Sequence, residues 1–225
     1  MNAVLDLFNV LHEPTAVFER VREKPRWLVP LLINIALLMV LTFVLRPYYI
    51  AAFQGVAGSL PPEQAARMPS PQTQAMFGVI FTPLAVFLGV LAGAGLLWVA
   101  GALTGAEARY KMMLAVLSHS YITFVLYSVV AGLVLFTRGV ESVSGMEDLR
   151  PALGLDLLAP DAGRFLGAFL NGINPFSIWG VWLTGVGVSV THKTSRGTGM
   201  TVAAIAYLIG LAISSALQML QGGPR

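Results

Sequence analysis

The sequence predicts an all-α integral membrane protein, a bundle of five transmembrane helices preceded by amphipathic helices at the membrane interface. Hydrophobic residues make up 56% of the chain and charged residues only 11%, well below the quarter that is usual in soluble domains. Apolar runs long enough to cross a bilayer, which takes about 20 residues, recur along the chain. The cations gather beside those runs, which indicates membrane orientation and not nucleic-acid binding.

The apolar runs divide the chain into a cytoplasmic amphipathic segment at 1–26 and a five-span membrane domain at 27–221. We expect the spans at about 27–45, 76–103, 112–136, 175–191 and 200–220. The first run begins only at Trp27, and its 19 residues are too many for the core of a signal peptide. A cleavable signal peptide is therefore not expected.

The segment before the first span carries two apolar faces at helical spacing, separated by a break at Glu13–Pro14–Thr15. The faces are Val4, Leu5, Phe8 and Leu11, and then Val17, Phe18 and Val21. Cations crowd its end beside the membrane, where anionic headgroups would meet them. We treat as a candidate cytoplasmic interaction face the residues Glu13, Pro14, Arg20, Arg22, Lys24 and Arg26. The alternative is that the segment only caps the bundle and carries orientation charges.

The first predicted span carries one strongly polar residue, Asn34. Arg46–Pro47 is predicted to end this span, and a Pro-rich connection follows over 47–75, with room for a short helix at 61–67. Ser70–Pro71 is typical of a helix start, with serine as the N-cap and proline at the first helical position.

Small residues four apart recur in the second and fifth predicted spans, where they would let helix backbones approach closely. We expect helix contacts at Gly89, Gly93, Ala206, Gly210 and Ser214. A short charged turn at 104–111 joins the second and third spans, which predicts a tight antiparallel hairpin.

The fourth apolar run is interrupted at Asn174–Pro175. The residue before a proline avoids the α region, and Asn followed by Pro suits an N-cap and a first helical turn. We therefore expect an interfacial half-helix over 163–172 and a short span over 175–191. The alternative is one long, kinked helix.

Few polar side chains lie inside the predicted spans, which makes each of them a candidate for a functional site. His119 is the only ionisable side chain other than tyrosine in any span, and the surrounding hydrocarbon predicts a neutral imidazole. Its role is either a hydrogen-bonded tie between helices or a gate or ligand contact at a wet cavity. The candidate intramembrane polar site comprises Asn34, His119, Tyr121, Asn174 and Pro175.

Catalytic, cofactor and metal constellations are not visible in the sequence. All acidic residues lie outside the predicted spans, the three histidines are scattered, and the serines lack a base-plus-orienter arrangement. Cysteine is absent, so there are neither disulfides nor thiolate ligands. We therefore expect a protein that is not an enzyme and that needs no cofactor or metal.

The distribution of cations predicts the orientation. One side holds compact basic segments with Arg20, Arg22, Lys24, Arg26, Arg109, Lys111, Lys193 and Arg196. The cations of the other side are spread over longer, acid-rich loops. The positive-inside rule therefore predicts a cytoplasmic N-terminus and a C-terminus outside.

Three stretches together resemble the Yip domain family, the Ypt/Rab-GTPase-interacting proteins and their bacterial relatives. They are Glu13–Pro14 with Pro25–Arg26–Trp27–Leu28–Val29–Pro30 before the first span, 105–120 at the start of the third, and Asn174–Pro175–Phe176–Ser177–Ile178–Trp179 in the fourth. The resemblance covers nearly the whole chain. It implies five spans and a cytoplasmic N-terminus, in agreement with the charges.

In eukaryotic members the resemblance also implies vesicle trafficking and binding of prenylated small GTPases. The Asp-Leu-Tyr-Gly-Pro and Gly-Tyr motifs of those members are absent from this sequence, as is their long cytoplasmic N-terminal domain. These departures argue against a small GTPase as partner. They indicate the bacterial-type branch and hence a bacterial inner-membrane location.

Two functions fit the sequence. The first is a non-enzymatic membrane organiser or partner-recruiting protein, which would contact membrane lipids and another membrane protein or a second copy of itself. The second is a small transporter or an accessory subunit of a membrane export complex, with the broken fourth helix and its polar groups lining a path. A path for a charged substrate usually shows more intramembrane charge than one histidine, and we therefore favour the first.

The orientation is testable with topology reporters. A reporter fused after Arg225 is expected outside, and one inserted within 194–197 is expected in the cytoplasm, because a span separates the two positions. Both reporters on the same side of the membrane would contradict the five-span prediction.

Overall fold

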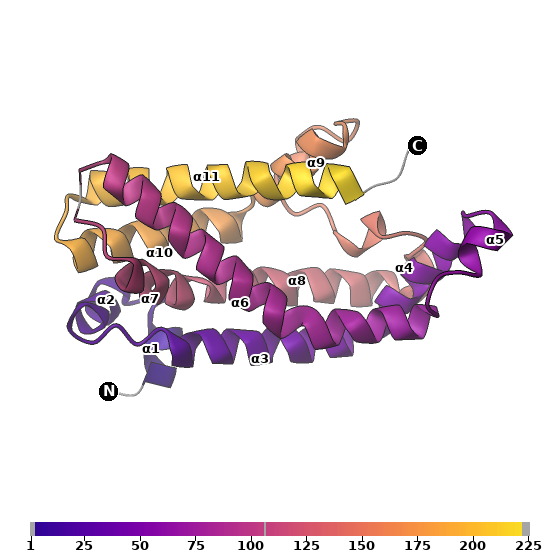
Figure 1. Cartoon of the computed structure of the whole chain (residues 1–225), viewed down its shortest axis with the longest axis horizontal. Helices are drawn as coiled ribbons and strands as arrows, with labels where there is room; N and C mark the ends of the chain where they lie inside the picture. Colours follow the sequence, from indigo (N-terminus) through magenta and orange to yellow (C-terminus); the bar gives the residue numbers. More distant parts are fainter. Residues whose placement is uncertain (1–2, 106, 222–225) are drawn as a thin grey trace. The chain divides into compact units, whose positions relative to one another are not determined.

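The computed structural model describes residues 3–105 and 107–221, with the side chains of that second range described as far as 218. Within these ranges the chain is helical apart from turns and short loops, and contains no strand (Figure 1). Three helical stretches are long and apolar enough to cross a membrane, Pro71–Leu103, Tyr110–Arg138 and Arg196–Gln218, and up to five if each of two bent helix pairs counts as one span. The predicted class, an all-α polytopic membrane protein, is confirmed.

The chain forms two compact units, which we describe separately. The first unit comprises the described parts of 1–34, 87–124 and 152–225. The second unit comprises 35–86 and 125–151.

Two short helices open the first unit, α1 (Ala3–Asn9) and α2 (Pro14–Glu23). Proline is tolerated in the first turn of α2, where its missing N–H has no helical partner in any case. The predicted apolar face of α2 is buried in full, with Val17, Phe18 and Val21 packed inward. The helix packs on α7 and α10, so α2 is part of the helical bundle.

The buried face of α1 differs from the predicted one. The structure buries Ala3, Asp6 and Leu7, and leaves Val4, Leu5 and Phe8 exposed. The cause is an ion pair, because Arg20 Nη2 of α2 lies 2.7 Å from Asp6 Oδ1. A charged hydrogen bond of this kind stabilises a carboxylate on the protein side of the helix, and the apolar residues on the other side of α1 stay exposed.

The first long helix, α3 (Leu28–Val44), is followed at once by α4 (Arg46–Gly58), which bends away by 60°. The predicted end at Arg46–Pro47 is therefore correct for α3, and the first part of the Pro-rich connection expected over 47–75 is a helix, which was not predicted. Pro47 lies in the first turn of a new helix, where its fixed φ is favourable. A short helix, α5 (Pro62–Ala65), lies where room for one was expected.

Helix α6 (Pro71–Leu103) begins at the expected serine–proline pair, and Ser70 Oγ accepts the Thr73 N–H at 3.2 Å.

The predicted third span is divided by one turn residue, Tyr121, into α7 (Tyr110–Ser120) and α8 (Ile122–Arg138). A loop with three single-turn helices follows: η1 (Val140–Ser142), η2 (Glu147–Leu149) and η3 (Leu155–Leu158).

The fourth apolar run is broken, as the first of the two alternatives predicts. Helix α9 (Arg164–Gly172) and helix α10 (Pro175–His192) meet at 58°.

The last helix, α11 (Arg196–Gln221), begins four residues before the predicted span. Its start follows Ser195, whose Oγ accepts the Thr198 N–H at 3.0 Å.

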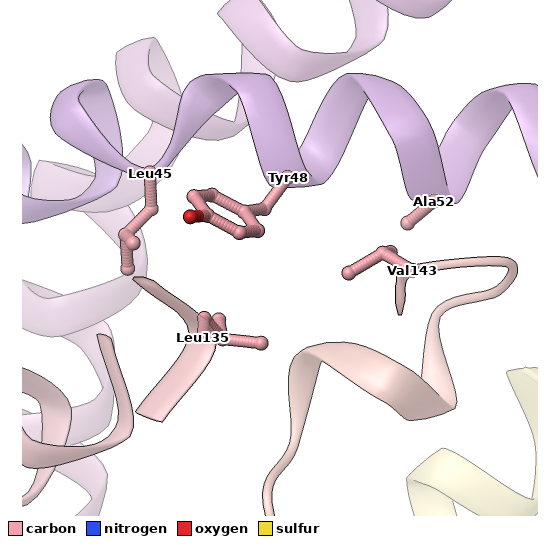
Figure 2. Packing of buried hydrophobic residues seen from close by; sticks show 5 residues of the cluster. All are labelled: Leu45, Tyr48, Ala52, Leu135 and Val143. Carbon is pink, nitrogen blue, oxygen red and sulfur yellow. The ribbon is translucent and has the colours of Figure 1, made fainter. Parts of the chain in front are cut away.

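The core of the second unit lies at the corner between α3 and α4. Figure 2 shows Leu45, Tyr48 and Ala52 facing Leu135 of α8 and Val143 of the following loop. Further along α4, Gly55 lies directly against the carbonyl of Ser144, and a Cβ at this position would overlap the carbonyl oxygen. The absence of a side chain at Gly55 therefore allows the loop to close on α4.

An aspartate caps the same loop. Asp148 Oδ2 accepts the Ser144 N–H at 2.7 Å, the Ser144 hydroxyl at 2.9 Å and the Gly145 N–H at 3.0 Å. The bond from the Ser144 N–H is the main cause that lowers the pKa of Asp148 below its usual value. Hydrogen bonds to the charged form of a carboxyl group favour that form.

Gly55 offers a matched test of this packing. Gly55→Ala should lower the stability by about 1–3 kcal/mol, the usual cost of overpacking a closed contact. Gly58→Ala is the control, because a Cβ at this position of the same helix meets nothing within 4 Å. Thermal unfolding in a mild detergent measures both, and equal melting temperatures for the two variants would contradict the close approach.

The Asp148 cap predicts a pH dependence. Because the pKa of folded Asp148 is below its unfolded value, its hydrogen bonds stabilise the protein above about pH 4, and this contribution is lost as the pH falls through the pKa of the folded state. Asp148→Asn should therefore be less stable than the wild type at about pH 6, and the difference should shrink as the pH is lowered toward the pKa of folded Asp148. Glu141→Gln, an exposed carboxylate in the same loop, is the control. A constant difference between Asp148→Asn and the wild type across this range would refute the cap.

Candidate functional site

The polar residues predicted to form an intramembrane site fall into two groups, and the first lies at the junction of α7 and α8. The last four carbonyls of a helix lack partners in the helix. Asn34 of α3 is fully buried and its Nδ2 donates to the carbonyl of Ser118 at 2.9 Å. Thr123 Oγ1 donates to the carbonyl of Ser120 at 3.0 Å. Two side chains thus satisfy carbonyls that the break at Tyr121 leaves open.

His119 lies at the same junction but does not tie two helices through a hydrogen bond that the structure describes. Its Nδ1 lies 2.8 Å from the carbonyl of Ala115, one turn earlier in its own helix. Its contact with another helix is aromatic, because the ring of Phe18 of α2 meets it edge-on with 6.4 Å between centroids. The interhelical hydrogen bond expected of His119 is made by Asn34.

Phe18 connects three elements of this unit. Its ring is fully buried and lies close to Gly187 of α10, where a Cβ would come within 3.0 Å of Phe18 Cζ and Cε1. The same Cβ would lie 2.5 Å from Val116 Cγ1 of α7. Glycine at 187 therefore provides the space that α2 occupies against α7 and α10. From the sequence, Phe18 is recognisable only as part of an apolar face.

Asn174 and Pro175 form the second polar group, at the break between α9 and α10. The Asn174 side chain accepts the Ser177 N–H at 3.0 Å, and the Ser177 hydroxyl lies 3.0 Å from the Asn174 N–H that donates to it. This reciprocal pair is a capping box, with Pro175 in the first turn of α10. Asn174 Nδ2 also donates to the carbonyl of Asn171 at 3.1 Å, so that one side chain serves both helices.

The two polar groups do not converge on one site. Gly187, beside Phe18, lies 12 residues after Pro175 on α10, which is about 18 Å at helical rise. The groups come nearer to each other only at Thr123, which lies against Gly180, five residues after Pro175. Tyr121 is only half-buried, and its ring packs on Phe124 with 5.2 Å between centroids. The predicted intramembrane polar site therefore separates into an Asn34–His119–Tyr121 group and an Asn174–Pro175 group.

Cations gather around the C-terminal end of α10, where the helix dipole favours positive charge. Arg22 of α2 donates from Nη1 to the carbonyl of Val190 at 3.4 Å, and Arg109 donates from Nη2 to the carbonyl of Thr191 at 3.4 Å. Lys193 ends the helix in the left-handed conformation, with φ 52°. The basic segments that predict the orientation thus also cap a helix.

His192 belongs to the same helix end. The backbone N–H of Arg109 donates to His192 Nε2 at 3.3 Å, so the neutral ring carries its proton on Nδ1. Nδ1 lies 2.9 Å from Thr191 Oγ1, which donates to the carbonyl of Gly187 at 2.7 Å. In the sequence His192 is one of three scattered histidines, and its place in a basic turn gives no signal of this link.

The candidate cytoplasmic interaction face divides into buried and exposed members. Pro14 is buried, Arg20 pairs with Asp6, and Arg22 caps α10. The exposed members are Glu13, Lys24 and Arg26. Further basic residues are exposed in or beside the turns of the same unit, among them Lys111, Lys193 and Arg196.

Two of the five small residues chosen for helix packing face away from other helices. Gly93 and Gly210 meet neighbouring side chains, since a Cβ would lie 2.7 Å from Leu117 Cδ2 and 3.3 Å from Leu96 Cδ1 respectively. Ala206 is buried. At Gly89, in contrast, a Cβ would meet nothing within 4 Å, and Ser214 is exposed while the next residue, Ser215, is buried. One residue of each pattern thus lies outside the helix contacts.

Metal ligands do not gather in the part of the chain that the structure describes: it holds no group of three or more His, Asp or Glu side chains that could bind an ion.

The helices and their capped breaks define a polytopic all-α membrane protein. A family model described as the Yip1 domain matches residues 8–217, and the chain belongs to the Yip1 domain family. The membrane protein YknW of Bacillus subtilis (strain 168) is 27% identical over 215 residues, which cover 89% of this chain and 84% of YknW. No solved structure matches the chain significantly. The resemblance seen in the sequence is confirmed.

Phe18 and Phe8 provide a matched test of how α2 is held. Phe18→Ala should cost about 3–5 kcal/mol, because it leaves a cavity between three helices. Phe8→Ala should be nearly silent, since Phe8 is exposed on α1. The readouts are the melting temperature in detergent and the rate of trypsin cleavage after Arg20 and Arg22, which should rise in Phe18→Ala only. Cleavage at the wild-type rate in Phe18→Ala would show that α2 is held by other contacts.

Proposed function

We propose that this Yip1 family membrane protein is a non-enzymatic recruiting protein, which binds another membrane protein through the exposed cations at the C-terminal end of α10. The observation that carries the proposal is the way the polar groups are used. Asn34, His119 and Asn174 bond to backbone carbonyls of the bundle itself. Exposed cations at the end where α2 is docked remain accessible to a partner.

This recruiting face consists of Lys24, Arg26, Lys111 and Lys193, all exposed. Its support is rigid, because Phe18 holds α2 in the bundle and Arg22 and Arg109 attach to the last turn of α10. Charge complementarity gives specificity and fast association to interfaces of this kind. The partner that fits is an acidic segment of a membrane protein, or of a second copy, at the cytoplasmic surface of a bacterial inner membrane.

Cross-linking in native membranes tests the proposal. The wild type, Lys24→Glu with Arg26→Glu, and the control Arg67→Glu, an exposed arginine of the second unit, are cross-linked, extracted in mild detergent and purified. A protein that is recovered with the wild type and the control but lost from the double variant supports the recruiting face. Equal recovery in all three would refute this face, and the identity of the recovered protein would show whether it is an exporter subunit or a small GTPase.

The break between α9 and α10 favours a second function, transport. Broken helices line substrate paths in many transporters, and here the two helices meet at 58°. The buried hydroxyl of Ser120 and the Oδ1 of Asn34 have no hydrogen-bond partner among the described residues, so a water or substrate that entered the α7–α8 junction would find open hydrogen-bonding groups there.

A cysteine at position 120 distinguishes the two functions. The chain has no cysteine, so Ser120→Cys introduces a single thiol at nearly the same size. Recruitment predicts that a small charged thiol reagent does not modify this thiol in folded protein. Rapid modification would show a water-filled path at the α7–α8 junction and would favour transport.

A further inference from the structure

The stretch that joins the loop to the fourth apolar run exposes large apolar side chains on two neighbouring elements. In η3, Leu158 is 81% exposed, Leu157 64% and Leu155 41%. In α9, Phe165 and Leu166 are exposed as well. An apolar patch on two packed elements of a protein marks a surface that another phase or molecule covers.

These two elements form one fixed body. The Leu155 N–H donates to the carbonyl of Ile173 at 3.0 Å, and Asn171 Nδ2 donates to Asp156 Oδ2 at 2.9 Å. Gly154 lies so close to the end of α9 that a Cβ would come within 2.7–2.9 Å of three backbone carbonyl oxygens, those of Leu170, Asn171 and Ile173. We call this body, residues 154–173, the η3–α9 element.

The contacts of this element with α11 give its depth. Tyr207 Oη donates to the carbonyl of Gly172 at 2.6 Å, and Leu211 fills the space beside Gly172. Tyr207 lies 11 residues and Leu211 15 residues into α11, which is about 16 and 22 Å from its basic start. Along α10 the break lies 18 residues from His192, or about 27 Å. In a hydrocarbon core of about 30 Å, all three values place the element in the leaflet far from the basic turns.

The bend keeps the element in that leaflet. Helix α9 leaves α10 at 58° (Figure 1) and has nine residues, about 14 Å of helix, so it cannot cross a bilayer. The exposed side chains around it on α10 and α11, Ile178, Trp182, Leu208 and Ile209, face the lipid around a spanning helix. The apolar patch continues this lipid-facing surface.

We propose that the η3–α9 element is a one-leaflet anchor, whose leucines and Phe165 insert at the boundary between headgroups and acyl chains of the leaflet opposite the basic turns. Asp161 and Arg164 are exposed where η3 connects to the start of α9, a position at which headgroups and water would solvate charge. An amphipathic element with this distribution lies in the interface plane. Continuity with the lipid-facing helices favours lipid over a protein partner as the occupant. The proposal does not depend on what the recruiting face binds.

Nitroxide quenching in vesicles tests the anchor. Single cysteines at Leu158 and Leu166 in the otherwise cysteine-free chain carry an NBD probe, and the protein is reconstituted in phosphatidylcholine–phosphatidylglycerol vesicles. The controls are Ile205, exposed on α11 about 14 Å from its start and hence near mid-bilayer, and Arg67 as an exposed position outside the element. We expect a nitroxide near the headgroup to quench the probes at 158 and 166 more strongly than one at the acyl-chain end, with the reverse order at 205.

Three results would overturn the proposal. Quenching by aqueous iodide at 158 and 166 as strong as at 67 would place the element in water. Quenching by neither lipid nitroxide nor iodide would mean that a protein, a partner or a second copy, covers the patch. If the nitroxide at the acyl-chain end quenched the probes at 158 and 166 most strongly, α9 would lie deep in the bilayer as the first part of a span.

The glycine at 154 tests whether the element acts as one body. In Gly154→Ala the Cβ displaces η3 from α9, so the probe at 158 should gain iodide accessibility while the probe at 166 keeps its quenching pattern. Gly163→Ala is the control, because a Cβ there meets nothing within 4 Å. An unchanged probe at 158 in Gly154→Ala would show that the docking on α9 does not hold the leucines in the leaflet.

Discussion

A broken helix in a membrane has to satisfy its own backbone, because no water is present in the hydrocarbon core to do so. The first unit depends on this requirement at both of its breaks. At the α7–α8 junction Asn34 and Thr123 satisfy open carbonyls. At the α9–α10 junction Asn174 caps one helix and closes the other, and Tyr207 takes the carbonyl of Gly172. The first role of these polar side chains is to bond the open backbone carbonyls at the helix breaks. Only polar groups that are not used in this way are available for function.

Much of the fold follows from local patterns in the sequence. Apolar length, Ser70–Pro71 and Asn174–Pro175 were sufficient to place α6, α9 and α10, because caps and prolines act within one helical turn. The failures have a common cause. The buried face of α1 and the helix after Arg46–Pro47 depend on partners distant in sequence, Arg20 for Asp6 and the loop carbonyl of Ser144 for Gly55. A single sequence contains no local signal for such contacts.

The candidate site was harder to predict than the fold. Rarity in or beside a span singled out Asn34, His119 and Asn174, but rarity does not show which groups meet. The length of α10 between Asn174 and Gly187 keeps the break at Asn174 away from the contact between Phe18 and His119. The hydrogen bond between helices that was expected of His119 is made by Asn34 instead. The basic residues were assigned only to orientation, although Arg22 and Arg109 also bond to the last carbonyls of α10. A count of charges contains no information on these acceptors.

The packing of Phe18 beside Gly187 also sets an order of events during synthesis. Helix α2 leaves the ribosome early, but the part of α10 that receives it is made 169 residues later, roughly 10–30 s at bacterial rates of elongation. Val116 of α7, which meets the same place, is made 98 residues after Phe18. Before then no spanning helix covers the apolar face of α2, its contacts with α10 stay open throughout the interval, and the membrane surface is the nearest apolar phase. The nascent chain therefore holds its first helices on the lipid and transfers α2 into the bundle only after the fourth apolar run has been inserted.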